Sequence, residues 1–441
     1  MPRTANSTSC RDYRPALLHA MSDLVGPSVF AEHQLRGWAW TPWMLTLAAL
    51  LMAWDSAATL MSRFDSVLVT LRQLYPKKPL GTTYQGFVKA LWGASAGLLL
   101  ALSVHLRHRM EQLAAAHWTR HGWCAFAVDG SRVECPRTEA NEKAFGRAGR
   151  NKTGPQLFLT TIYHMGTGVP WAYQIGPGTD SERNHLRHML GLLPTRALLV
   201  ADAGFVGYDL LSGILSGGRH FLIRVGSNVR LLRKLGYCRQ EKDNMVYLWP
   251  DAQRKSQQPP LILRLIVLND GRKPVFLVTD VPDKAALTDR QAGELYRMRW
   301  GVEVFYRSLK QTLARRKMRS EAPDQARCEL AWAVMGLWVL SLMTAHRLIV
   351  AGEDPLRLSV ASALRIVHRA VRHPPRSAEA RTVLSQLDHA VQDSYRRKAA
   401  KKARNWPHKK NDRPPGVPRI LIANQEQVAH AKALYDKTKA A

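Results

Sequence analysis

The most constraining feature of this sequence is a short, uninterrupted apolar run at residues 196–202 (RALLVAD), which ends in an acid. Such a run is typical of a central strand that is buried on both faces of a sheet. Three strand-like segments precede it, at residues 124–135, 156–164 and 169–175, and a glycine turn joins the last two into a hairpin. A helix with a polar start is expected at residues 179–193. These elements predict an α/β fold built around one sheet.

The segments after this run complete the order of the elements. Residues 208–215 are expected to be helical and residues 220–225 to form a further strand. Residues 226–285 contain several strand-like pieces and are predicted to be a β-rich insertion. A helix then begins around Leu287 and runs past Lys310. The predicted order is therefore three strands, helix, strand, helix, strand, insertion and helix.

The flanking regions differ from this central part. Residues 1–115 show helical spacing of apolar residues and are predicted to be a helical domain that is a candidate for DNA contact. Residues 116–345 form the predicted central domain, and residues 346–441 a helical C-terminal region. Within that region, residues 396–413 (RRKAAKKARNWPHKKNDR) carry nine Lys or Arg against one Asp. A basic arm of this kind is expected to attract phosphates without regard to base sequence.

The charge of the chain points to the class of its partner. Its 441 residues include 64 Lys and Arg against 34 Asp and Glu, a formal net charge of +30. This surplus favours a polyanion, with nucleic acid expected before an anionic membrane. The five scattered cysteines indicate a reducing cytoplasm, and the N-terminus lacks the apolar stretch of a signal peptide. Apolar stretches at residues 37–54 and 331–345 fall short of the roughly 20 residues that span a bilayer, so buried helices are expected there.

Three acids occupy positions where chemistry is expected. Asp129 lies within the first strand, Asp202 ends the apolar run, and Glu303 lies on the last helix. The first and fourth strands are neighbours in a sheet of this order, which would bring the two aspartates together. Converging carboxylates repel, and hard cations such as Mg²⁺, two of them about 3.5–4 Å apart, would relieve the repulsion and serve phosphodiester chemistry. Taken singly, each acid also fits a turn, a helix cap or the surface.

The helix around Glu303 gives this hypothesis further support. At 100° per residue, one narrow apolar stripe contains Leu295, Met298, Val302, Phe305 and Leu309. A second stripe on its flank contains Tyr296, Arg299, Glu303, Arg307 and Lys310. A ladder of ion pairs explains the arginines but neither the tyrosine nor the lysine. We therefore expect the phenolic and basic members of this stripe to bind DNA phosphates: Tyr296, Arg299, Arg307 and Lys310.

These residues also carry a family resemblance. The segment YRMRWGVEVFYRSLK has the spacing Y-(2)-R-(3)-E-(6)-K, with Tyr296, Arg299, Glu303 and Lys310 in the four places. It resembles the signature of the IS4-type DDE transposases of bacterial insertion sequences. The blocks AVDGSRV, around Asp129, and VADAGF, which contains the second aspartate, resemble the other acidic blocks of that family. The resemblance covers roughly residues 120–345.

The resemblance implies an RNase H-like catalytic core in which Asp129, Asp202 and Glu303 bind two Mg²⁺ (or Mn²⁺) ions. It implies a transposase that cleaves transposon ends and joins them to target DNA by cut-and-paste transfer, as a homodimer in a bacterial, nucleoid-associated cytoplasmic setting without a membrane. Many relatives excise through a DNA hairpin with a tryptophan from the insertion stacked on a flipped base. Trp249 is the candidate here only because it lies in the insertion, and a buried structural role is the stronger interpretation.

Three other interpretations remain open at this point. The same fold would serve a metal-dependent DNA nuclease or Holliday-junction resolvase that does not transfer strands. A catalytically silent repressor derived from a transposase would bind DNA alone. A basic protein on an anionic membrane is the fourth possibility, and it predicts vesicle binding with indifference to DNA.

Overall fold

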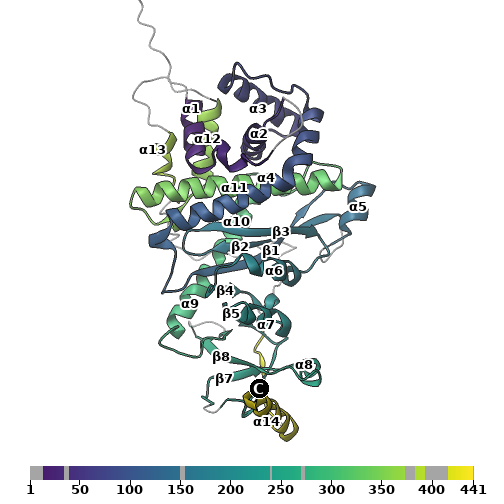
Figure 1. The fold of residues 1–441 in the computed structure, drawn as a ribbon, viewed down its shortest axis with the longest axis vertical. Helices are drawn as coiled ribbons and strands as arrows, with labels where there is room; N and C mark the ends of the chain where they lie inside the picture. The colour runs from purple at the N-terminus through teal and green to yellow at the C-terminus, as the bar shows by residue number, and fades with distance from the viewer. Residues whose placement is uncertain are drawn as a thin grey trace, which may run out of the picture.

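One ten-stranded sheet organises the protein. The structure is a computed structural model that describes residues 13–33, 39–148, 154–238, 241–269, 274–372, 383–392 and 416–440. The strands lie in the order β10-β6-β7-β8-β9-β5-β4-β1-β2-β3 (Figure 1). They are β1 (Ala125–Glu134), β2 (Gln156–His164), β3 (Val169–Pro177), β4 (Leu198–Ala201), β5 (His220–Val225), β6 (Arg230–Arg233), β7 (Met245–Leu248), β8 (Leu261–Leu268), β9 (Val275–Thr279) and β10 (Arg419–Ile422). The predicted α/β class is therefore correct at this level.

Helices pack along and beyond the sheet. They are α1 (Tyr13–Leu24), α2 (Pro42–Trp54), α3 (Leu60–Leu74), α4 (Tyr84–Leu113), α5 (Glu139–Phe145), α6 (Glu182–Met189), α7 (Tyr208–Ser216), α8 (Asp251–Lys255), α9 (Asp289–Met298), α10 (Trp300–Arg307), α11 (Pro323–Val350), α12 (Val360–Arg372), α13 (Val383–Leu387) and α14 (Gln425–Ala440). Short 3-10 turns lie at Pro27–Phe30, Ala115–His117, Leu190–Leu192, Ala203–Phe205 and Pro355–Arg357. A π-helical turn, Ser308–Thr312, continues α10.

Two neighbour relations that the sequence predicts are found in the central half of the sheet: the β2–β3 hairpin and the pair of β1 and β4. Strand β1 pairs antiparallel with β2, and β2 with β3, while β1 and β4 run parallel. Strand β5 runs parallel to β4, whose four residues are all buried, as its uninterrupted apolar run requires. Asp129 does not lie in a turn, one of the roles that it would also fit, because β1 continues through Asp129 and Gly130 in register with Thr161 and Thr160 of β2.

The β-rich insertion extends this same sheet. Strand β9 pairs antiparallel with β5, so β9, β8, β7 and β6 continue the sheet outward. Strand β10 joins parallel to β6, and α14 covers a small second core that includes Leu232, Trp249 and Leu434. The C-terminal region, expected to be helical, also contains the strand β10, which the sequence does not predict because a four-residue strand that pairs with a distant part of the chain leaves little trace in local sequence.

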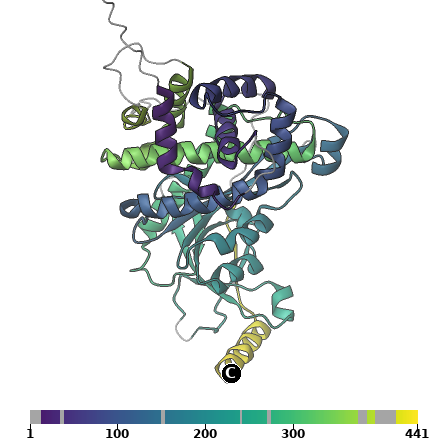
Figure 2. The ribbon, with the colours of Figure 1, turned by 45° about the horizontal axis from the view of Figure 1, so that its top comes forward.

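Helix α11 is the core of the helical half. It packs against α2, α4 and β3, and the N-terminal helices lie over it in Figures 1 and 2. The two apolar stretches expected to be buried helices lie in α2 and α11, and both helices are largely buried. By length and composition α4 and α11 are apolar enough to cross a membrane, but burial of most of α11 is equally typical of a core helix. Helix α4 exposes Trp92 and Leu100.

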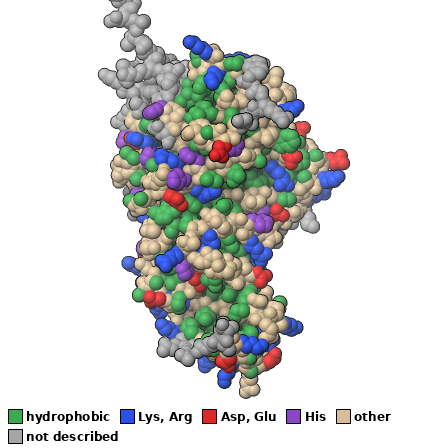
Figure 3. Space-filling model, viewed as in Figure 1, with side chains coloured by type: hydrophobic (Ala, Val, Ile, Leu, Met, Phe, Trp, Pro, Cys, Tyr) green, Lys and Arg blue, Asp and Glu red, His purple; other side chains and the backbone are tan. Residues whose placement is uncertain are grey.

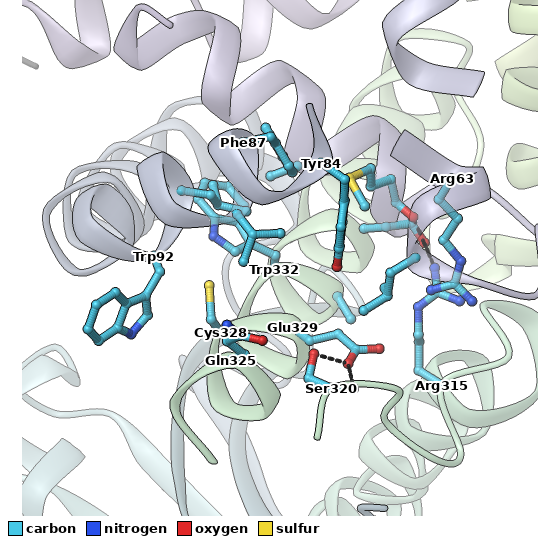
Figure 4. Close-up of a pocket in the computed structure, with 17 residues that line it drawn as sticks. Arg63, Tyr84, Phe87, Trp92, Arg315, Ser320, Gln325, Cys328, Glu329 and Trp332 are labelled. Atoms are coloured by element: carbon cyan, nitrogen blue, oxygen red, sulfur yellow. Dashed lines mark hydrogen bonds between the residues drawn. The ribbon is translucent and has the colours of Figure 1, made fainter. Parts of the chain in front are cut away.

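Arg315 joins the helical half to the chain that follows α10. This guanidinium is almost fully buried and donates hydrogen bonds to the carbonyls of Met52, Ala53 and Asp55, at the C-terminal end of α2. Figure 4 shows it at the wall of a small cavity of about 70 Å³, beside Arg63. The division of the chain at residues 115 and 345 stays a prediction, and the basic arm at residues 396–413 lies outside the described residues.

Candidate active site

The parallel pairing of β1 and β4 brings the two aspartates together. Ala127 pairs with Val200, and the same register two residues further on sets Asp129 beside Asp202. Asp129 is still within β1, whereas Asp202 follows the last residue of β4 and begins the turn Ala203–Phe205. The point at which the parallel pairing of β1 and β4 ends thus presents two acids at one place.

Each of the three predicted acids has one oxygen fixed by a hydrogen bond. Oδ1 of Asp129 accepts from the backbone N–H of Gly130 at 2.8 Å. Oδ1 of Asp202 accepts from the backbone N–H of Ala203 at 2.8 Å and from the Tyr296 hydroxyl at 3.2 Å. Oε1 of Glu303 accepts from Arg299 at 3.0 Å. Among the described residues, none donates a hydrogen bond to the second oxygen of these carboxylates.

Arg299 lies in the middle of this group. It stands at the break between α9 and α10, is largely buried, and contacts Glu303 while its other arm lies 3.8 Å from Oδ2 of Asp129. Its guanidinium also lies over the Tyr296 ring, 5.6 Å from the centroid. Burial alone lowers the pKa of Arg299, but Tyr296 and the surrounding carboxylates outweigh it and raise that pKa. The arginine is therefore a fixed positive charge among acids.

Burial and mutual repulsion disfavour the ionised forms of Asp129 and Glu303. Burial raises the pKa of Asp129, and the neighbouring Asp202 raises it further against the opposing effects of the Gly130 N–H and Arg299. Burial likewise raises the pKa of Glu303, with Arg299 opposing and Asp129 adding to the rise. Half-buried acids whose charges repel one another are stabilised by an additional cation.

The predicted phosphate-binding residues are only partly gathered here. Tyr296 and Arg299 adjoin the acids, and Lys310, in the π-helical turn, donates to the hydroxyl of Ser131 on β1 at 2.8 Å. Burial lowers the pKa of Lys310. Arg307 is exposed and lines a different groove, together with Tyr163. Its role in phosphate binding therefore stays a prediction.

The donor set suits a hard divalent cation, although the side chains are not closed around one. Within the described ranges, no three His, Cys, Asp or Glu side chains lie close enough to hold a single ion. The second oxygens of Asp129, Asp202 and Glu303 nevertheless accept no hydrogen bond from a described residue, and carboxylate oxygen is the donor that Mg²⁺ prefers. The Arg299 guanidinium occupies the position of a cation between Asp129 and Glu303. The residues at this place therefore include the oxygen donors that a divalent cation needs, with a guanidinium now lying where the cation would bind.

A basic groove lies beside the acids. It has a volume of about 600 Å³ and is lined by four arginines and one acid together with apolar side chains: Arg224, Arg290, Arg297, Arg299 and Asp289. Trp300, 59% exposed, lies on its wall. On the face seen in Figure 3, Lys and Arg side chains are spread over the whole surface rather than gathered in one patch. The groove is thus a local concentration of positive charge next to the acids.

Sequence reasoning missed three residues of this region. Arg224, on β5, lies near the Tyr296 hydroxyl and lowers the pKa of Tyr296 against the larger effect of burial. Glu182, at the start of α6, lies within the electrostatic reach of Asp129 and Asp202. The third is Trp300, on the wall of the groove. The sequence could have pointed to Arg224, because an arginine interrupts the apolar strand HFLIRV. Nothing in the local sequence distinguishes Trp300 or Glu182.

Trp249 does not occupy the place of a stacking residue. It is buried in the second core, and its indole N–H donates to the carbonyl of Gln258 at 2.8 Å. The structural interpretation of this tryptophan is confirmed, and as it lies it offers no ring face to a base.

Comparison with known proteins identifies the class of this site. Residues 121–339 match the family described as "Transposase DDE domain", and this range contains all three acids. The protein carries a transposase DDE domain.

Two curated proteins similar to this chain are transposases of insertion sequence elements. The chain is 28% identical over 232 residues to transposase InsG for insertion sequence element IS4 from Escherichia coli K12, across 50% of this chain and 51% of that protein. It is 19% identical over 193 residues to a putative transposase for insertion sequence element IS4SA from Synechocystis sp., across 43% and 53%. The chain is thus similar to IS4-type DDE transposases, as its motifs indicate, and it spans about half the length of the curated relatives that it matches.

A solved structure, the cryo-EM piggyBac transposase synaptic complex with hairpin DNA, aligns over 91% of this chain and 90% of that chain at 12% identity. Its TM-score is 0.42, which supports no conclusion about the fold.

Proposed function

We propose that this protein is a DNA transposase that cleaves transposon ends and joins them to target DNA by two-metal-ion phosphodiester transfer. The observation that carries the proposal is the convergence of Asp129, Asp202 and Glu303 around Arg299, from three separate parts of the chain. Half-buried charged groups whose pKa values are shifted by burial and by specific charged neighbours cluster at functional sites. The IS4-type signature around these acids supports the same conclusion.

The strand order supports an RNase H-like core for this domain. Strands β3, β2, β1, β4 and β5 are adjacent in that order, with β1 antiparallel to β2 and parallel to β4. We propose residues 116–345 as the catalytic domain, with helical regions on either side.

The residues of the site would divide the work between the metal and the DNA. Asp129, Asp202 and Glu303 would hold two Mg²⁺ or Mn²⁺ ions, which supply water activation and stabilisation of the leaving oxygen. Tyr296 keeps Asp202 oriented through its hydroxyl, and Lys310 lies next to β1, where it can meet a phosphate. Arg299 can exchange its carboxylate partners for a DNA phosphate, since guanidinium binds both.

The partners follow from this chemistry. The groove lined by Arg224, Arg290 and Arg297 would take the backbone of the transposon end, and the net charge of +30 would add attraction that salt weakens. Transposition pairs two ends, so a homodimer is proposed for the complex with DNA. The proposed location is the bacterial cytoplasm, on the nucleoid.

The test uses purified full-length protein and linear DNA that carries the terminal repeat of the element. Wild type is expected to cut at the repeat and to join the freed 3′ end to a second DNA in Mg²⁺. Asp202→Asn and Glu303→Gln are expected to bind the repeat in gel-shift assays without cutting it, whereas Asp209→Asn, an exposed acid of α7, cuts normally.

Three other results would replace the proposal. Cutting without joining in any target would favour a nuclease or resolvase. Specific binding without cutting by wild type, in Mg²⁺ and in Mn²⁺, would favour a silent DNA-binding protein. Sedimentation with anionic vesicles and indifference to DNA would favour the membrane-associated alternative.

A further inference from the structure

A fourth carboxylate reaches the same centre from helix α6. Glu182 is the first residue of α6, which packs against β1, β2 and the turn Ala203–Phe205. Burial raises the pKa of Glu182, and the charge of Asp129 adds to the rise. The negative charges of Asp129 and Asp202 disfavour the ionised form of Glu182, so another interaction has to explain why this carboxylate lies here.

Two glycines make the room that this carboxylate occupies. A Cβ added to Gly130 would lie 2.9 Å from Oε2 of Glu182, and a Cβ added to Gly204 would lie 2.6 Å from Oε1. Gly130 directly follows Asp129, and Gly204 is the second residue after Asp202. The carboxylate of Glu182 therefore sits between the two backbone segments that present the aspartates.

Two nearby arginines, Arg132 and Arg183, oppose the rise in the pKa of Glu182 by their charge, but their hydrogen bonds go to other groups. Arg132 donates to the carbonyl of Gly178 and lies over the Phe158 ring at 4.7 Å. Arg183 donates to the carbonyl of Gly204 at 2.6 Å. Among the described residues, none forms a hydrogen bond or an ion pair with the Glu182 carboxylate. A half-buried carboxylate without such a partner is a free oxygen donor for a cation.

We propose that Glu182 is a fourth carboxylate of the catalytic centre and holds one of its divalent cations, directly or through a water molecule. The inference rests on the proposed function and adds a residue to it that the three-acid signature does not contain. It also gives a reason for Gly204, where a side chain would push the carboxylate away.

The first test compares Glu182→Gln with Glu139→Gln. Both acids lie in the first turn of a short helix, so a stabilising effect on the helix end is common to the two. Protein bound to terminal-repeat DNA is titrated with Mn²⁺ alone, and free Mn²⁺ is read by paramagnetic resonance. Glu182→Gln is expected to weaken Mn²⁺ binding about tenfold or more and to slow cutting, with metal-free DNA binding unchanged. Glu139→Gln is expected to match wild type.

Gly204→Ala supplies a second, independent variant. Its methyl group meets the flexible end of Glu182, so folding is little affected while the carboxylate is displaced. Weaker Mn²⁺ binding is expected in Gly204→Ala, with no additional loss when it is combined with Glu182→Ala. Equal losses in both backgrounds would mean that Gly204 acts by another route and would overturn the inference.

The outcomes separate this inference from the function on which it rests. If wild type binds Mn²⁺ and cuts DNA while Glu182→Gln matches it in both assays, the fourth carboxylate is wrong and the transposase stands. If wild type binds Mn²⁺ no better than Asp129→Asn does and never cuts, the proposed function fails, and the inference fails with it.

Discussion

Arg299 donates a hydrogen bond from Nη2 to Oε1 of Glu303 at 3.0 Å, and its Nη1 lies 3.8 Å from Oδ2 of Asp129. The guanidinium thus bridges the first and third acids of the site. The positive charge of the guanidinium offsets the repulsion between the carboxylates of Asp129 and Glu303, which is strong because both acids are half-buried. A divalent cation that takes the same oxygens has to compete with this arginine.

Arg299→Ala is expected to show that competition. Without DNA, the variant should bind Mn²⁺ about three- to tenfold more tightly than wild type, because Glu303 has lost its internal partner. Its affinity for the transposon end should fall, because one phosphate contact is gone. Calorimetric Mn²⁺ titration and gel-shift assays measure the two effects. Unchanged or weaker Mn²⁺ binding would mean that the arginine does not compete.

Tyr296→Phe is expected to slow cutting by about three- to tenfold with little change in stability. It removes the hydroxyl that donates to Oδ1 of Asp202, and the ring remains in place. Tyr306→Phe is the comparison, because the Tyr306 hydroxyl donates to the carbonyls of Asp129 and Leu159 instead. That variant should lose about 1 kcal/mol of unfolding free energy in urea titrations. Equal cutting by Tyr296→Phe and wild type would exclude a role for its hydroxyl.

Lys310→Gln is expected to weaken end binding and to reduce the slope of log affinity against log salt by about one. The reason is that its ammonium group lies beside Ser131 on β1, next to the acids. Arg307→Gln tests the other predicted phosphate contact, on the groove that contains Tyr163. A reduced slope in both variants would place DNA on both sides of α10, and an unchanged slope for Arg307→Gln would restrict it to one.

His164 predicts a loss of stability in acid. Its ring is buried, stacks on Trp118 and bonds to the Trp118 carbonyl and the Thr167 hydroxyl. Burial lowers the pKa of His164 from 6.5 to about 4. The unfolded chain therefore binds the proton first, so this stability is complete above pH 6.5 and is lost as the pH falls towards 4.

The loss amounts to about 3 kcal/mol across that range, from a shift of this size. Urea unfolding at a series of pH values should show it in wild type and in His188→Gln, an exposed histidine of α6. His164→Gln should be less stable at neutral pH and should lack this part of the acid dependence. The same slope in all three proteins would contradict the assignment.

Arg315→Met is expected to destabilise the protein by about 3 kcal/mol. Its buried guanidinium donates hydrogen bonds to three carbonyls near the end of α2, those of Met52, Ala53 and Asp55. Methionine would leave these buried carbonyls without a donor. Burial lowers the pKa of Arg315 to about 10, so the charge persists at neutral pH. Arg316→Met, one residue further on and exposed, is the matched control for thermal and urea unfolding. Equal stability of the two variants would mean that these hydrogen bonds contribute little.

Local sequence patterns predicted the parts of the fold that are periodic. The uninterrupted run at β4 predicts a strand that is buried on both faces, and the order of elements then places β1 next to β4. The glycine turn predicts the β2–β3 hairpin, although both strands are buried over most of their length rather than at alternate residues. The meeting of Asp129 and Asp202 followed from that order. The helical stripe likewise predicted that Tyr296 and Arg299 share a side with Glu303.

The rest depended on contacts between distant segments. Glu182 is unremarkable in its own helix, and only the packing of α6 against β1 brings it to the aspartates. Arg307 shares the stripe with Glu303, yet it is exposed and lines a groove with Tyr163 of the distant strand β2. Strand β10 is equally invisible, since its partner β6 lies far back along the chain.

Strand β10 also bears on how the protein is handled. It is the last strand at its end of the sheet, and with α14 it shields β6 and the second core around Leu232 and Trp249. Deleting residues 416–441 would leave the edge of β6 without a partner strand and would expose the hydrophobic side chains of the second core to solvent. An unpaired strand edge beside exposed hydrophobic surface favours aggregation. Variants that lack residues 416–441 are therefore expected to aggregate, and an affinity tag is better placed at the N-terminus.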